Sequence, residues 1–413
     1  MLFPFPTPPA KPHRVVITGA GIVTALGSGW RINADGFREG RQAVCPVTLF
    51  DVSRQRAKIA AEVDLPDEIP ATKLSARRVT RLDRATKMLL LAAHEAWNQS
   101  GWQADANIPL VLGTTGGAMS LGENYLSQAI RSPQSQRHQA TRAVNYQAQR
   151  QALDVCDAFG FSGPITIIAN ACASGANAVG HAWELVRHGR ATRVLTGGHD
   201  SLCQLIFAGF DSLQALSPSP CRPFDAQRTG LTLGEGAAIL TLETLEHAQQ
   251  RGAEILGEII GYAAATDIHH LTQPHPEGNA AFATMTGACK IAGVTPDQVD
   301  YVNAHGTATP HNDSTEAVAI NRWAGARVAT LPVSSTKACI GHTLGAAGAV
   351  EAVVSLMTLR EQWLPPEPGL VTADPACGFP IVRERTDACV NVVMSNSFGF
   401  GGANATLLLR RWM

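Results

Sequence analysis

The stretch Pro164-Ile-Thr-Ile-Ile-Ala169, followed directly by Asn170-Ala-Cys-Ala-Ser-Gly175, is the part of the sequence that decides the fold. Residues 164–169 are apolar and largely β-branched, which predicts a short buried strand. The next six residues are small, and a helical pattern of apolar residues then continues to Gly189. The sequence therefore predicts a strand that turns sharply into a helix, with Cys172 at the turn.

Cys172 is a candidate nucleophile because of this position. A thiol at the start of a helix faces unpaired backbone N–H groups and the positive end of the helix dipole, and both favour the reactive thiolate. A cysteine is more often a small buried hydrophobic residue, so its position alone does not decide its role. Two downstream segments support the functional interpretation: Asn303-Ala-His-Gly-Thr-Ala-Thr-Pro310 and Thr336-Lys-Ala-Cys-Ile-Gly-His-Thr-Leu-Gly345. Each places a histidine, His305 or His342, in a glycine-containing turn, where the side chain can face a cleft.

The composition is that of a globular protein with ample core material. The chain has 413 residues, of which 45% are hydrophobic and 16% charged, and its formal net charge is -1. This balance predicts neither a nucleic-acid partner nor a membrane surface, and the apolar runs are too short for a membrane span. The prolines within residues 1–12 argue against a signal or transit peptide. Nine cysteines without a CxxC pair predict free thiols in a reducing compartment, most simply the cytoplasm.

Strand and helix patterns alternate along the chain, which predicts an α/β protein with helices on the faces of its sheets. Strands are expected at Arg14–Thr18, Pro109–Leu112, Ile165–Ala169, Arg193–Thr196, Glu254–Tyr262, Val299–Asn303, Ala329–Ser334, Val390–Met394 and Ala405–Leu409. Helices are expected at Asp83–Gln99, Ala173–His188, Ala280–Ala292, Asp313–Trp323 and Ala346–Leu359. The repeated rhythm predicts two halves, 13–250 and 251–413, that meet near Ala248–Gly252. The polar segment Arg131–Gln147 predicts an exposed excursion.

The glycine-rich segment Thr18-Gly-Ala-Gly-Ile-Val-Thr24 begins like a dinucleotide-binding turn after a strand. Thr24 stands where the third glycine is needed, and no acidic residue follows a second strand at the required distance. We therefore expect a tight structural turn here and no site for NAD.

Four motifs, in order along the chain, carry a family resemblance. They are residues 170–175, residues 303–310, Thr336-Lys-Ala-Cys-Ile-Gly-His-Thr-Leu-Gly-Ala-Ala-Gly348 and Ser395-Asn-Ser-Phe-Gly-Phe-Gly-Gly-Ala-Asn-Ala405, with Arg222–Asp225 and Gly234–Ala237 between the first two. From Arg14 onward the chain resembles the elongating β-ketoacyl-acyl-carrier-protein synthases of the thiolase superfamily. The resemblance implies a thiolase-like αβαβα fold of five layers made of two duplicated halves. It also implies an acyl carrier protein as partner, and a homodimer or a heterodimer with a homologous subunit.

The resemblance implies a decarboxylative Claisen condensation in two stages. An acyl chain moves from a carrier thioester to Cys172, and malonyl-acyl-carrier protein then loses carbon dioxide and attacks the acyl-enzyme to give 3-oxoacyl-acyl-carrier protein. By matching the motifs, His305 and His342 are expected to stabilise the enolate, with Lys337 supporting them and Glu351 holding the network electrostatically. No cofactor and no metal is implied, because the substrates are carried on the phosphopantetheine of the carrier protein.

The same matching assigns residues around the nucleophile. Thr307 and Thr309 match hydroxyls that contact the phosphopantetheine arm, and Phe400 matches a gating aromatic residue. The glycines that flank Phe400 allow its loop to swing, and a backbone N–H of this loop is expected to join that of Cys172 in an oxyanion hole. Phe398 is expected beside the substrate. Asn404 is expected to support the site from behind.

Two segments depart from the general fatty-acid enzymes. Thr115 stands where those enzymes carry a bulky aliphatic residue that gates the acyl pocket, and Thr141–Tyr146 replaces an aromatic and proline run near the pocket end. A changed pocket wall predicts an unsaturated or aryl-terminated chain, as in polyene or aryl polyene biosynthesis, in place of a simple saturated acyl chain. Fatty acid biosynthesis stays open as the alternative pathway.

Three related classes fit the sequence less well. A thiolase carries a second cysteine in the C-terminal glycine loop, and Gly399–Asn404 has none. An initiating synthase has asparagine in place of the second histidine, whereas His342 is present. A catalytically silent chain-length factor lacks the nucleophile, whereas Cys172 is present. The sequence therefore predicts an active enzyme, and it leaves open that this enzyme works only as a heterodimer with a chain-length-factor-like partner.

Overall fold

The computed structural model describes residues 11–132, 134 and 141–413. Within these residues the main sheet has eleven strands in the order β11-β10-β14-β15-β9-β1-β8-β7-β5-β6, with the short β2 paired to β1. The first half of the chain supplies β1 (Val15–Thr24), β2 (Gly27–Ser28), β5 (Leu110–Gly113), β6 (Ile165–Ile168), β7 (Arg193–Asp200) and β8 (Gly236–Thr244). The second half supplies β9 (Gly257–Thr266), β10 (Tyr301–Asn303), β11 (Val333–Ser334), β14 (Val392–Phe398) and β15 (Ala403–Arg410).

The two halves of this sheet have the same topology. Strands β1 and β9, the first main strand of each half, lie side by side at the centre of the sheet. Outward from this centre the order is β1-β8-β7-β5-β6 in the first half and β9-β15-β14-β10-β11 in the second, so that each half places its first, fifth, fourth, second and third main strand in the same sequence. In each half the second strand pairs in parallel with the third and the fourth, while the fifth pairs antiparallel with the fourth and the first. The predicted duplication is therefore present in the strand order, although the residues of the two halves differ.

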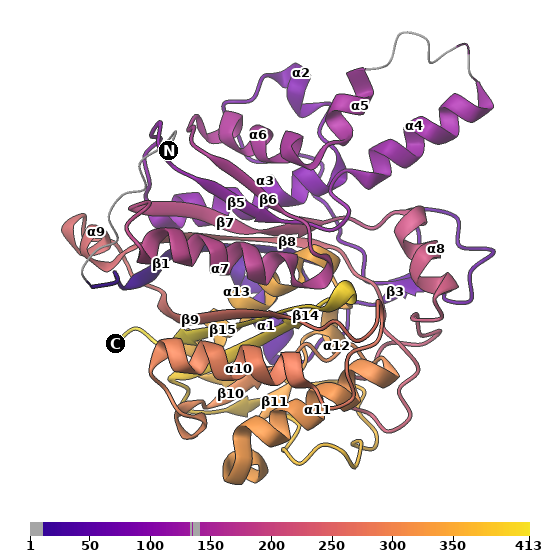
Figure 1. Ribbon diagram of the computed structural model, residues 1–413. Helices are drawn as coiled ribbons and strands as arrows, with labels where there is room; N and C mark the ends of the chain where they lie inside the picture. The colour runs from indigo at the N-terminus through magenta and orange to yellow at the C-terminus, as the bar shows by residue number, and fades with distance from the viewer. Residues whose placement is uncertain (1–10, 133, 135–140) are drawn as a thin grey trace.

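Helices separate and cover the two halves of the sheet, so that five layers result (Figure 1). The central layer contains α7 (Ser174–Arg187) and α13 (Ala347–Glu361), which pack on each other and on both halves. The outer face of the first half carries α3 (Arg84–Ser100) and α6 (Ala148–Phe159). The outer face of the second half carries α10 (Asn279–Ala292) and α11 (Pro310–Ala324). The predicted αβαβα arrangement is confirmed.

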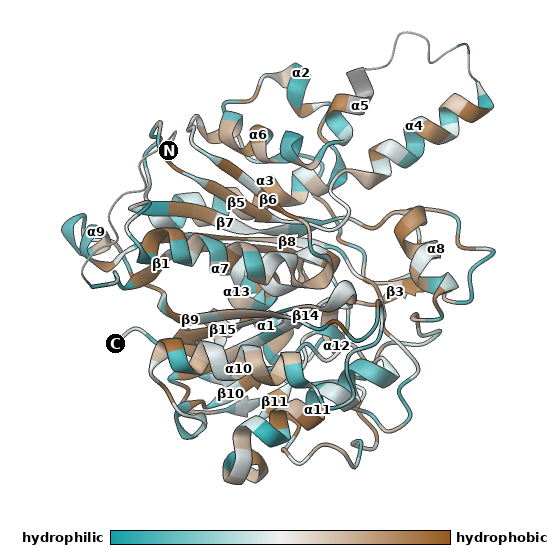
Figure 2. Ribbon diagram, viewed as in Figure 1, coloured by the Kyte–Doolittle hydropathy of each residue, from teal (hydrophilic) through white to brown (hydrophobic). Residues whose placement is uncertain are grey.

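The central helix α13 shows why the layers form in this way. All residues from Ala347 to Leu359 are buried, and only the last turn of the helix reaches solvent. A helix that is apolar on all sides is stable only when it is covered on all sides. The strands that enclose it are correspondingly apolar along their length, as the brown ribbons in Figure 2 show. Burial at about 25 cal/mol per Å² of apolar surface is the main stabilising contribution to such a core.

The segment Thr18–Thr24 is not the expected tight turn, because it continues as part of strand β1. Its glycines serve a different purpose. A Cβ atom on Gly19 would lie 2.1 Å from the backbone oxygen of Ala96, and one on Gly21 would lie 1.9 Å from that of Ala92. Glycine therefore lets helix α3 pack directly on the backbone of the strand. Strand β8 was also not expected, although it lies in the middle of the sheet.

The remaining elements connect or cover this framework. The further α-helices are α1 (Trp30–Arg38), α2 (Ala76–Val79), α4 (Met119–Arg131), α5 (Thr141–Tyr146), α8 (Gln204–Ser212), α9 (Leu245–Gln250) and α12 (Lys337–Ile340). The short strands are β3 (Cys45–Pro46), β4 (Ile59–Ala60), β12 (Trp363–Leu364) and β13 (Thr386–Asp387). The 3₁₀-helices are η2 (Ala171–Ala173), η3 (Pro296–Gln298), η4 (Gly325–Thr330), η5 (Leu344–Ala346) and η6 (Phe400–Gly402). No helix among the described residues is both long enough and apolar enough to cross a membrane.

The predicted excursion Arg131–Gln147 falls between α4 and α6, and part of it, residues 133 and 135–140, lies outside the described residues. Helices α4 and α5 project from the body of the molecule beside α6 and α8 (Figure 1). Helix α4 has no buried residue. Its apolar side chains Leu126 and Ile130 are 61% and 72% exposed, which is high for residues of this kind.

Candidate active site

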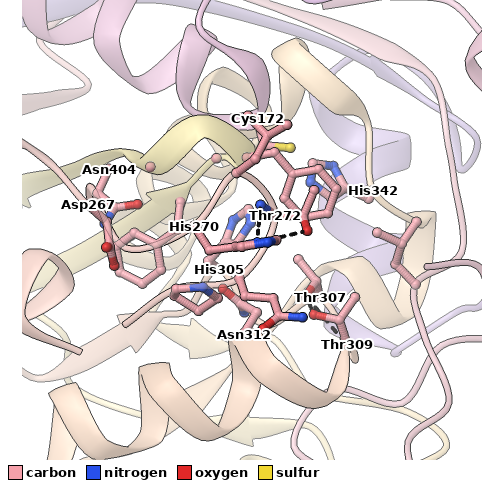
Figure 3. Close-up of a pocket in the computed structure, with 18 of the residues that line it drawn as sticks. Cys172, Asp267, His270, Thr272, His305, Thr307, Thr309, Asn312, His342 and Asn404 are labelled. Atoms are coloured by element: carbon pink, nitrogen blue, oxygen red, sulfur yellow. Dashed lines mark hydrogen bonds between the residues drawn. The ribbon is translucent and has the colours of Figure 1, made fainter. Parts of the chain in front are cut away.

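The sheet topology brings the candidate residues to one edge. Cys172 follows β6, His305 follows β10, His342 follows β11 and Phe400 follows β14. Each of these strands belongs to a parallel pair, and each candidate residue follows the carboxyl end of its strand. Binding sites commonly form in the crevice at the carboxyl ends of parallel strands. Residues separated by more than a hundred positions in the sequence therefore line one cavity (Figure 3).

Cys172 lies in a short 3₁₀ turn between β6 and α7, and its side chain is buried. Ala171 before it has φ 57°, in the left-handed region that an L-residue with a Cβ rarely occupies. The side chain of Ser174 holds this turn, because its Oγ donates to the Ala171 oxygen at 2.5 Å and accepts from the Asn170 N–H at 2.9 Å. The strained turn presents the thiol to the cavity before α7 begins.

The protonation state of Cys172 differs from the sequence-based expectation. Burial raises the pKa of the thiol to about 11, although the charge of Lys337 and the backbone N–H groups of Phe400 and Cys172 itself lower it. The removal of water therefore outweighs the helix start, and the free enzyme holds a thiol near neutral pH. The backbone N–H groups of Phe400 and Cys172 face the sulfur. When the sulfur attacks a carbonyl carbon, the oxyanion that forms on that carbon could accept hydrogen bonds from both N–H groups. The predicted oxyanion hole requires this arrangement of two N–H donors.

The backbone around His342 fixes its ring. Its Nδ1 atom accepts the backbone N–H of Leu344 at 3.0 Å, and its own backbone N–H donates to the Thr232 oxygen at 2.7 Å. In a neutral imidazole with Nδ1 as acceptor, the hydrogen is on Nε2. The Nε2 atom is buried and has no partner among the described residues. It is therefore a free donor on the side of the ring that lines the cavity.

His305 is held in the equivalent state by different groups. The carboxylate of Glu316 accepts the backbone N–H groups of His305 and Gly306, each at 2.8 Å. The ammonium of Lys337 donates to the His305 backbone oxygen at 2.6 Å, and its Nζ lies 3.4 Å from Nδ1. An ammonium can only donate, so Nδ1 accepts and the ring hydrogen is again on Nε2. The sequence therefore builds two imidazoles with the same tautomer.

Both imidazoles are neutral. Burial lowers the pKa of His305 and of His342 well below its usual range, and the nearby ammonium of Lys337 lowers each further. The two ring centroids lie 5.4 Å apart with their planes at 84°. Glu351 forms an ion pair with Lys337, and both side chains are 2% exposed. Burial raises the pKa of Glu351 while Lys337 opposes this effect, so the pair keeps a compensated charge behind the histidines.

The cavity has a volume of about 50 Å³. Eight residues expected from the sequence line it: Cys172, His305, His342, Thr307, Thr309, Phe398, Phe400 and Asn404. The hydroxyls of Thr307 and Thr309 lie 2.8 Å apart, and Figure 3 shows the two side chains next to each other. Lys337 and Glu351 lie behind the histidines, as the motifs predict, and do not line the cavity. A cavity of this size holds little more than one or two solvent molecules, so a long acyl chain needs additional room.

Phe400 closes one side of this cavity. Its ring stacks on Phe210 of α8, with centroids 5.8 Å apart and an interplanar angle of 22°. The following Gly401 and Gly402 have φ 79° and 80°, which glycine adopts without strain. Their backbone is bonded to the segment after β9, because the Gly401 N–H donates to the Leu271 oxygen at 2.7 Å and Gly402 accepts from Asp267 at 2.8 Å. Residues 267–274 of that segment supply much of the cavity wall, and the sequence analysis did not single them out.

Three buried carboxylates that sequence reasoning missed hold the loops of the site. Glu316 binds the His305 turn as described above. Asp313 accepts the N–H groups of Thr307 and Ala308 at 3.0 and 3.1 Å. Asp200 accepts the N–H groups of Thr115, Gly116 and Gly345 at 2.8, 2.7 and 2.6 Å. Burial raises the pKa of Asp200 to about 6 despite these bonds. An acidic residue four positions after the expected strand Arg193–Thr196 was the available signal for Asp200.

The two positions that are expected to shape the acyl pocket do not line this small cavity. Thr115 is exposed, and its hydroxyl donates to the Ala171 oxygen at 3.1 Å, next to the nucleophile but outside the cavity lining. Of the segment Thr141–Tyr146, Tyr146 packs on α4, where its hydroxyl lies 3.4 Å from the sulfur of Met119. A separate apolar groove of about 570 Å³ runs here, lined by Met119, Gly122, Leu126, Ile130, Tyr146 and Leu205 among others.

Comparisons with known proteins agree with this geometry. Residues 13–248 match the family described as "Beta-ketoacyl synthase, N-terminal domain", and residues 256–370 match "Beta-ketoacyl synthase, C-terminal domain". The chain belongs to the β-ketoacyl synthase family. It is a ketosynthase, an enzyme that forms carbon–carbon bonds by condensation.

The relatives of this ketosynthase include acyl-carrier-protein synthases and polyketide synthases. It is 37% identical to "3-oxoacyl-[acyl-carrier-protein] synthase 2" of Synechocystis sp., over 97% of this chain and 98% of the relative. It is also 37% identical to "Putative polyketide beta-ketoacyl synthase 1" of Streptomyces cyaneus, over 96% of this chain and 98% of the relative. Among solved structures, "The ishigamide ketosynthase/chain length factor" matches with TM-score 0.91 and 31% identity, over 97% of this chain and 100% of that chain. The thiolase-like fold that the motifs imply is thus confirmed.

Proposed function

We propose that this ketosynthase is an elongating 3-oxoacyl-acyl-carrier-protein synthase in which Cys172 carries the growing acyl chain. The observation that supports this most strongly is the convergence of one thiol and two neutral imidazoles on one cavity, each imidazole with its ring hydrogen on Nε2. A neutral donor suits a developing enolate oxygen, because it stabilises the new charge without first forming an ion pair with the substrate carboxylate. The names of the relatives, as acyl-carrier-protein synthases, support the substrate class.

In the first stage the Cys172 sulfur attacks the thioester carbonyl of the acyl-carrier protein. The new carbon–sulfur bond forms as the bond to the phosphopantetheine sulfur breaks, and the proton of the Cys172 thiol ends on the carrier thiol that leaves. The N–H groups of Cys172 and Phe400 stabilise the oxyanion of the tetrahedral intermediate. The ammonium of Lys337 lowers the cost of forming the thiolate during this step.

In the second stage malonyl-acyl-carrier protein occupies the same cavity. Its carboxylate leaves as carbon dioxide, and the electron pair of the broken bond forms an enolate whose oxygen accepts the Nε2–H groups of His305 and His342. The enolate carbon attacks the acyl carbon on Cys172, and the cysteine sulfur leaves and takes up one proton from solvent. The hydroxyls of Thr307 and Thr309 line the side where the carrier arm would enter. No cofactor takes part in this scheme, because the phosphopantetheine of the carrier is part of the substrate.

A second proposal concerns the partner. We infer that the enzyme works as a heterodimer with a homologous chain-length-factor-like subunit rather than as a homodimer. The similar structures named "The ishigamide ketosynthase/chain length factor" and "Ketosynthase (ApeO) in Complex with its Chain Length Factor (ApeC) from Xenorhabdus doucetiae" support it. The exposed apolar groove along α4 supports the presence of a protein partner, because a groove of this kind is a common interaction surface. Co-purification of the tagged enzyme from cells of its native host, followed by mass spectrometry, distinguishes a homologous partner subunit from a second copy of this chain.

The substrate proposal is an unsaturated or aryl-terminated acyl chain in a specialised pathway. Thr115 supports it, because a threonine hydroxyl bonded to the Ala171 oxygen leaves more room beside Cys172 than a bulky aliphatic side chain would. The alternative is a saturated chain in fatty acid biosynthesis, which the synthase 2 relatives favour.

Intact-mass analysis tests the nucleophile. After incubation with acyl-acyl-carrier protein, the wild type and a Cys156→Ala control should each gain one acyl group. Cys172→Ala should gain none and should form no 3-oxoacyl product. An adduct that maps to Cys339 or Cys156 in the wild type would reject the assignment.

A further inference from the structure

Glu367 is a buried acid that the proposed chemistry does not use. It lies three residues after β12 (Trp363–Leu364) and is 1% exposed. Its Oε2 atom accepts the backbone N–H of Ser335 at 3.0 Å, whereas its Oε1 atom is buried and has no partner in the described part of the chain. An acid in such a position is costly to bury, so it requires a reason.

Ser335 connects Glu367 to the catalytic histidine turn. The Oγ atom of Ser335 donates to the Gly306 oxygen at 2.7 Å, directly after His305. The approach is close, because a Cβ on Gly306 would lie 2.5 Å from the Ser335 Cβ. Two residues further along, Lys337 holds the imidazole and the backbone oxygen of His305. The turn that carries His305 is therefore held on two sides. Glu316 accepts the N–H groups of the turn, and Ser335, which Glu367 holds in place, donates to the carbonyl oxygen of Gly306.

The groups around Glu367 disfavour a negative charge there. The carboxyl groups of Asp225, which precedes β8, and of Asp313 and Glu316 on α11 all raise the pKa of Glu367, in addition to burial, which is the largest cause. The phenol and thiol groups that interact with Glu367 carry no positive charge that could stabilise its carboxylate. They are Tyr301 on β10, Cys221, Cys339 on α12 and Cys377. The two buried cations of this region already have partners, since Lys337 pairs with Glu351 and Arg228 pairs with Asp374.

We propose that Glu367 is a positioning residue for His305 and that it works as an uncharged carboxylic acid. Its carbonyl oxygen fixes the backbone N–H of Ser335, and Ser335 in turn fixes the carbonyl group of Gly306. A carboxylic acid rather than a carboxylate fits the site, because Lys337 and Arg228 are already paired with other carboxylates and three further carboxyl groups lie close enough to repel a charge. This inference rests on the proposed role of His305.

Two substitutions separate the parts of this proposal. Glu367→Gln keeps the pattern of the neutral acid, since its amide oxygen can accept from Ser335 while its NH₂ group takes the place of the acid O–H. Glu367→Leu has a similar volume and removes the acceptor. Glu384→Gln, an exposed glutamate of the same C-terminal region, is the matched control. All four proteins are measured as the full chain with any partner subunit that it requires.

Stability as a function of pH tests the charge. When the pKa of a buried acid is raised above its usual 4.5, the unfolded chain releases its proton first as pH rises, so wild-type stability falls with rising pH until Glu367 itself ionises. Glu367→Gln lacks this effect. Its Tm relative to wild type should therefore increase between about pH 5 and about pH 8, whereas Glu384→Gln should run parallel to wild type. A Tm for Glu367→Gln that falls below wild type and drops further as pH rises would show a stabilised carboxylate and overturn the proposal.

Malonyl-carrier decarboxylation tests the positioning role. We expect Glu367→Leu to lose about ten- to a hundredfold in this rate while remaining folded, because the His305 turn is displaced, and Glu367→Gln to retain wild-type activity. At alkaline pH the wild type should lose activity where Glu367→Gln does not. Wild-type decarboxylation by folded Glu367→Leu overturns the proposal. If His305→Ala decarboxylates like the wild type, the proposed role of His305 fails instead, and the pH dependence of Tm still reports on the charge of Glu367.

Discussion

The ammonium of Lys337 contacts His305 at two atoms: its Nζ lies 3.4 Å from Nδ1 of the ring and donates to the backbone oxygen at 2.6 Å. Because an ammonium cannot accept, this contact sets the ring hydrogen on Nε2, and its charge helps to keep the imidazole neutral. Glu351 compensates the charge of Lys337 within the core. Lys337 thus sets the tautomer of His305 and, together with burial, keeps the ring neutral.

Replacement of Lys337 tests this relationship. Lys337→Met should lower malonyl decarboxylation and move its acid limb toward neutral pH, because the charge that lowers the pKa of His305 is lost. It should also destabilise the fold by about 3–5 kcal/mol, since Glu351 loses its partner. The double variant Lys337→Met/Glu351→Leu should recover stability but not activity. Recovery of both would mean that Lys337 contributes only to folding.

The pH dependence of acylation follows from the raised pKa of Cys172. Since burial raises the thiol pKa to about 11, the thiolate fraction in the free enzyme grows about tenfold per pH unit through the neutral range. Alkylation of Cys172 by a small reagent should therefore rise with pH without a plateau below about pH 9. A plateau near pH 7 would show that the helix start and Lys337 outweigh burial after all.

Phe400→Ala tests the gate. Without its stack on Phe210 the loop should no longer close the cavity over the thiol, so acylation by a long acyl-carrier substrate should slow by about tenfold. Thermal stability should stay at the wild-type value, and alkylation of Cys172 by a small reagent should be no slower than in the wild type, because an open cavity does not hinder a small reagent. A trapped acyl-enzyme whose Phe400 ring keeps its stack on Phe210 would contradict a gating role.

Thr115→Ile tests the substrate proposal. The variant adds bulk beside the Cys172 turn and removes the hydroxyl that bonds to Ala171. The preference for polyunsaturated over saturated acyl-carrier substrates of matched length, taken as a ratio of kcat/KM values, should fall by about 1–3 kcal/mol. Thr115→Val, which keeps the shape of threonine, is the control. An unchanged ratio in Thr115→Ile removes the argument from this position, and a wild-type preference for saturated chains removes the substrate proposal.

Much of this structure could be predicted from local patterns, and the failures have physical causes. Strand β6 and helix α7 were predicted because apolar β-branched residues and helical spacing are local signals. The segment around Gly19 and Gly21 was misread as a turn because glycine there permits contact with α3, and such a contact is not local. Asp200, Glu316 and Glu367 were missed for the same reason, since their partners lie on other elements.

The candidate catalytic residues could be predicted from the sequence only because they lie within recognisable motifs. Cys172, His305 and His342 were recognised from residues beside them, and the sheet topology brings them together. The pKa of Cys172 was predicted in the wrong direction, because the helix start is visible in the sequence whereas the degree of burial is not. The role of Thr115 in the acyl pocket stays a prediction, and what the sequence did not show is that Asp200 holds its backbone while its hydroxyl donates to the Ala171 oxygen beside Cys172.

The central claim, that two neutral imidazoles stabilise the enolate, is tested most directly by the rate at which malonyl-acyl-carrier protein loses carbon dioxide without an acyl acceptor. His305→Ala and His342→Ala should each lower this rate by about a hundredfold or more, the effect of losing one oxyanion donor. His188→Ala, at the far end of α7, should leave it unchanged. Near wild-type decarboxylation by either folded active-site variant would contradict the paired role of His305 and His342.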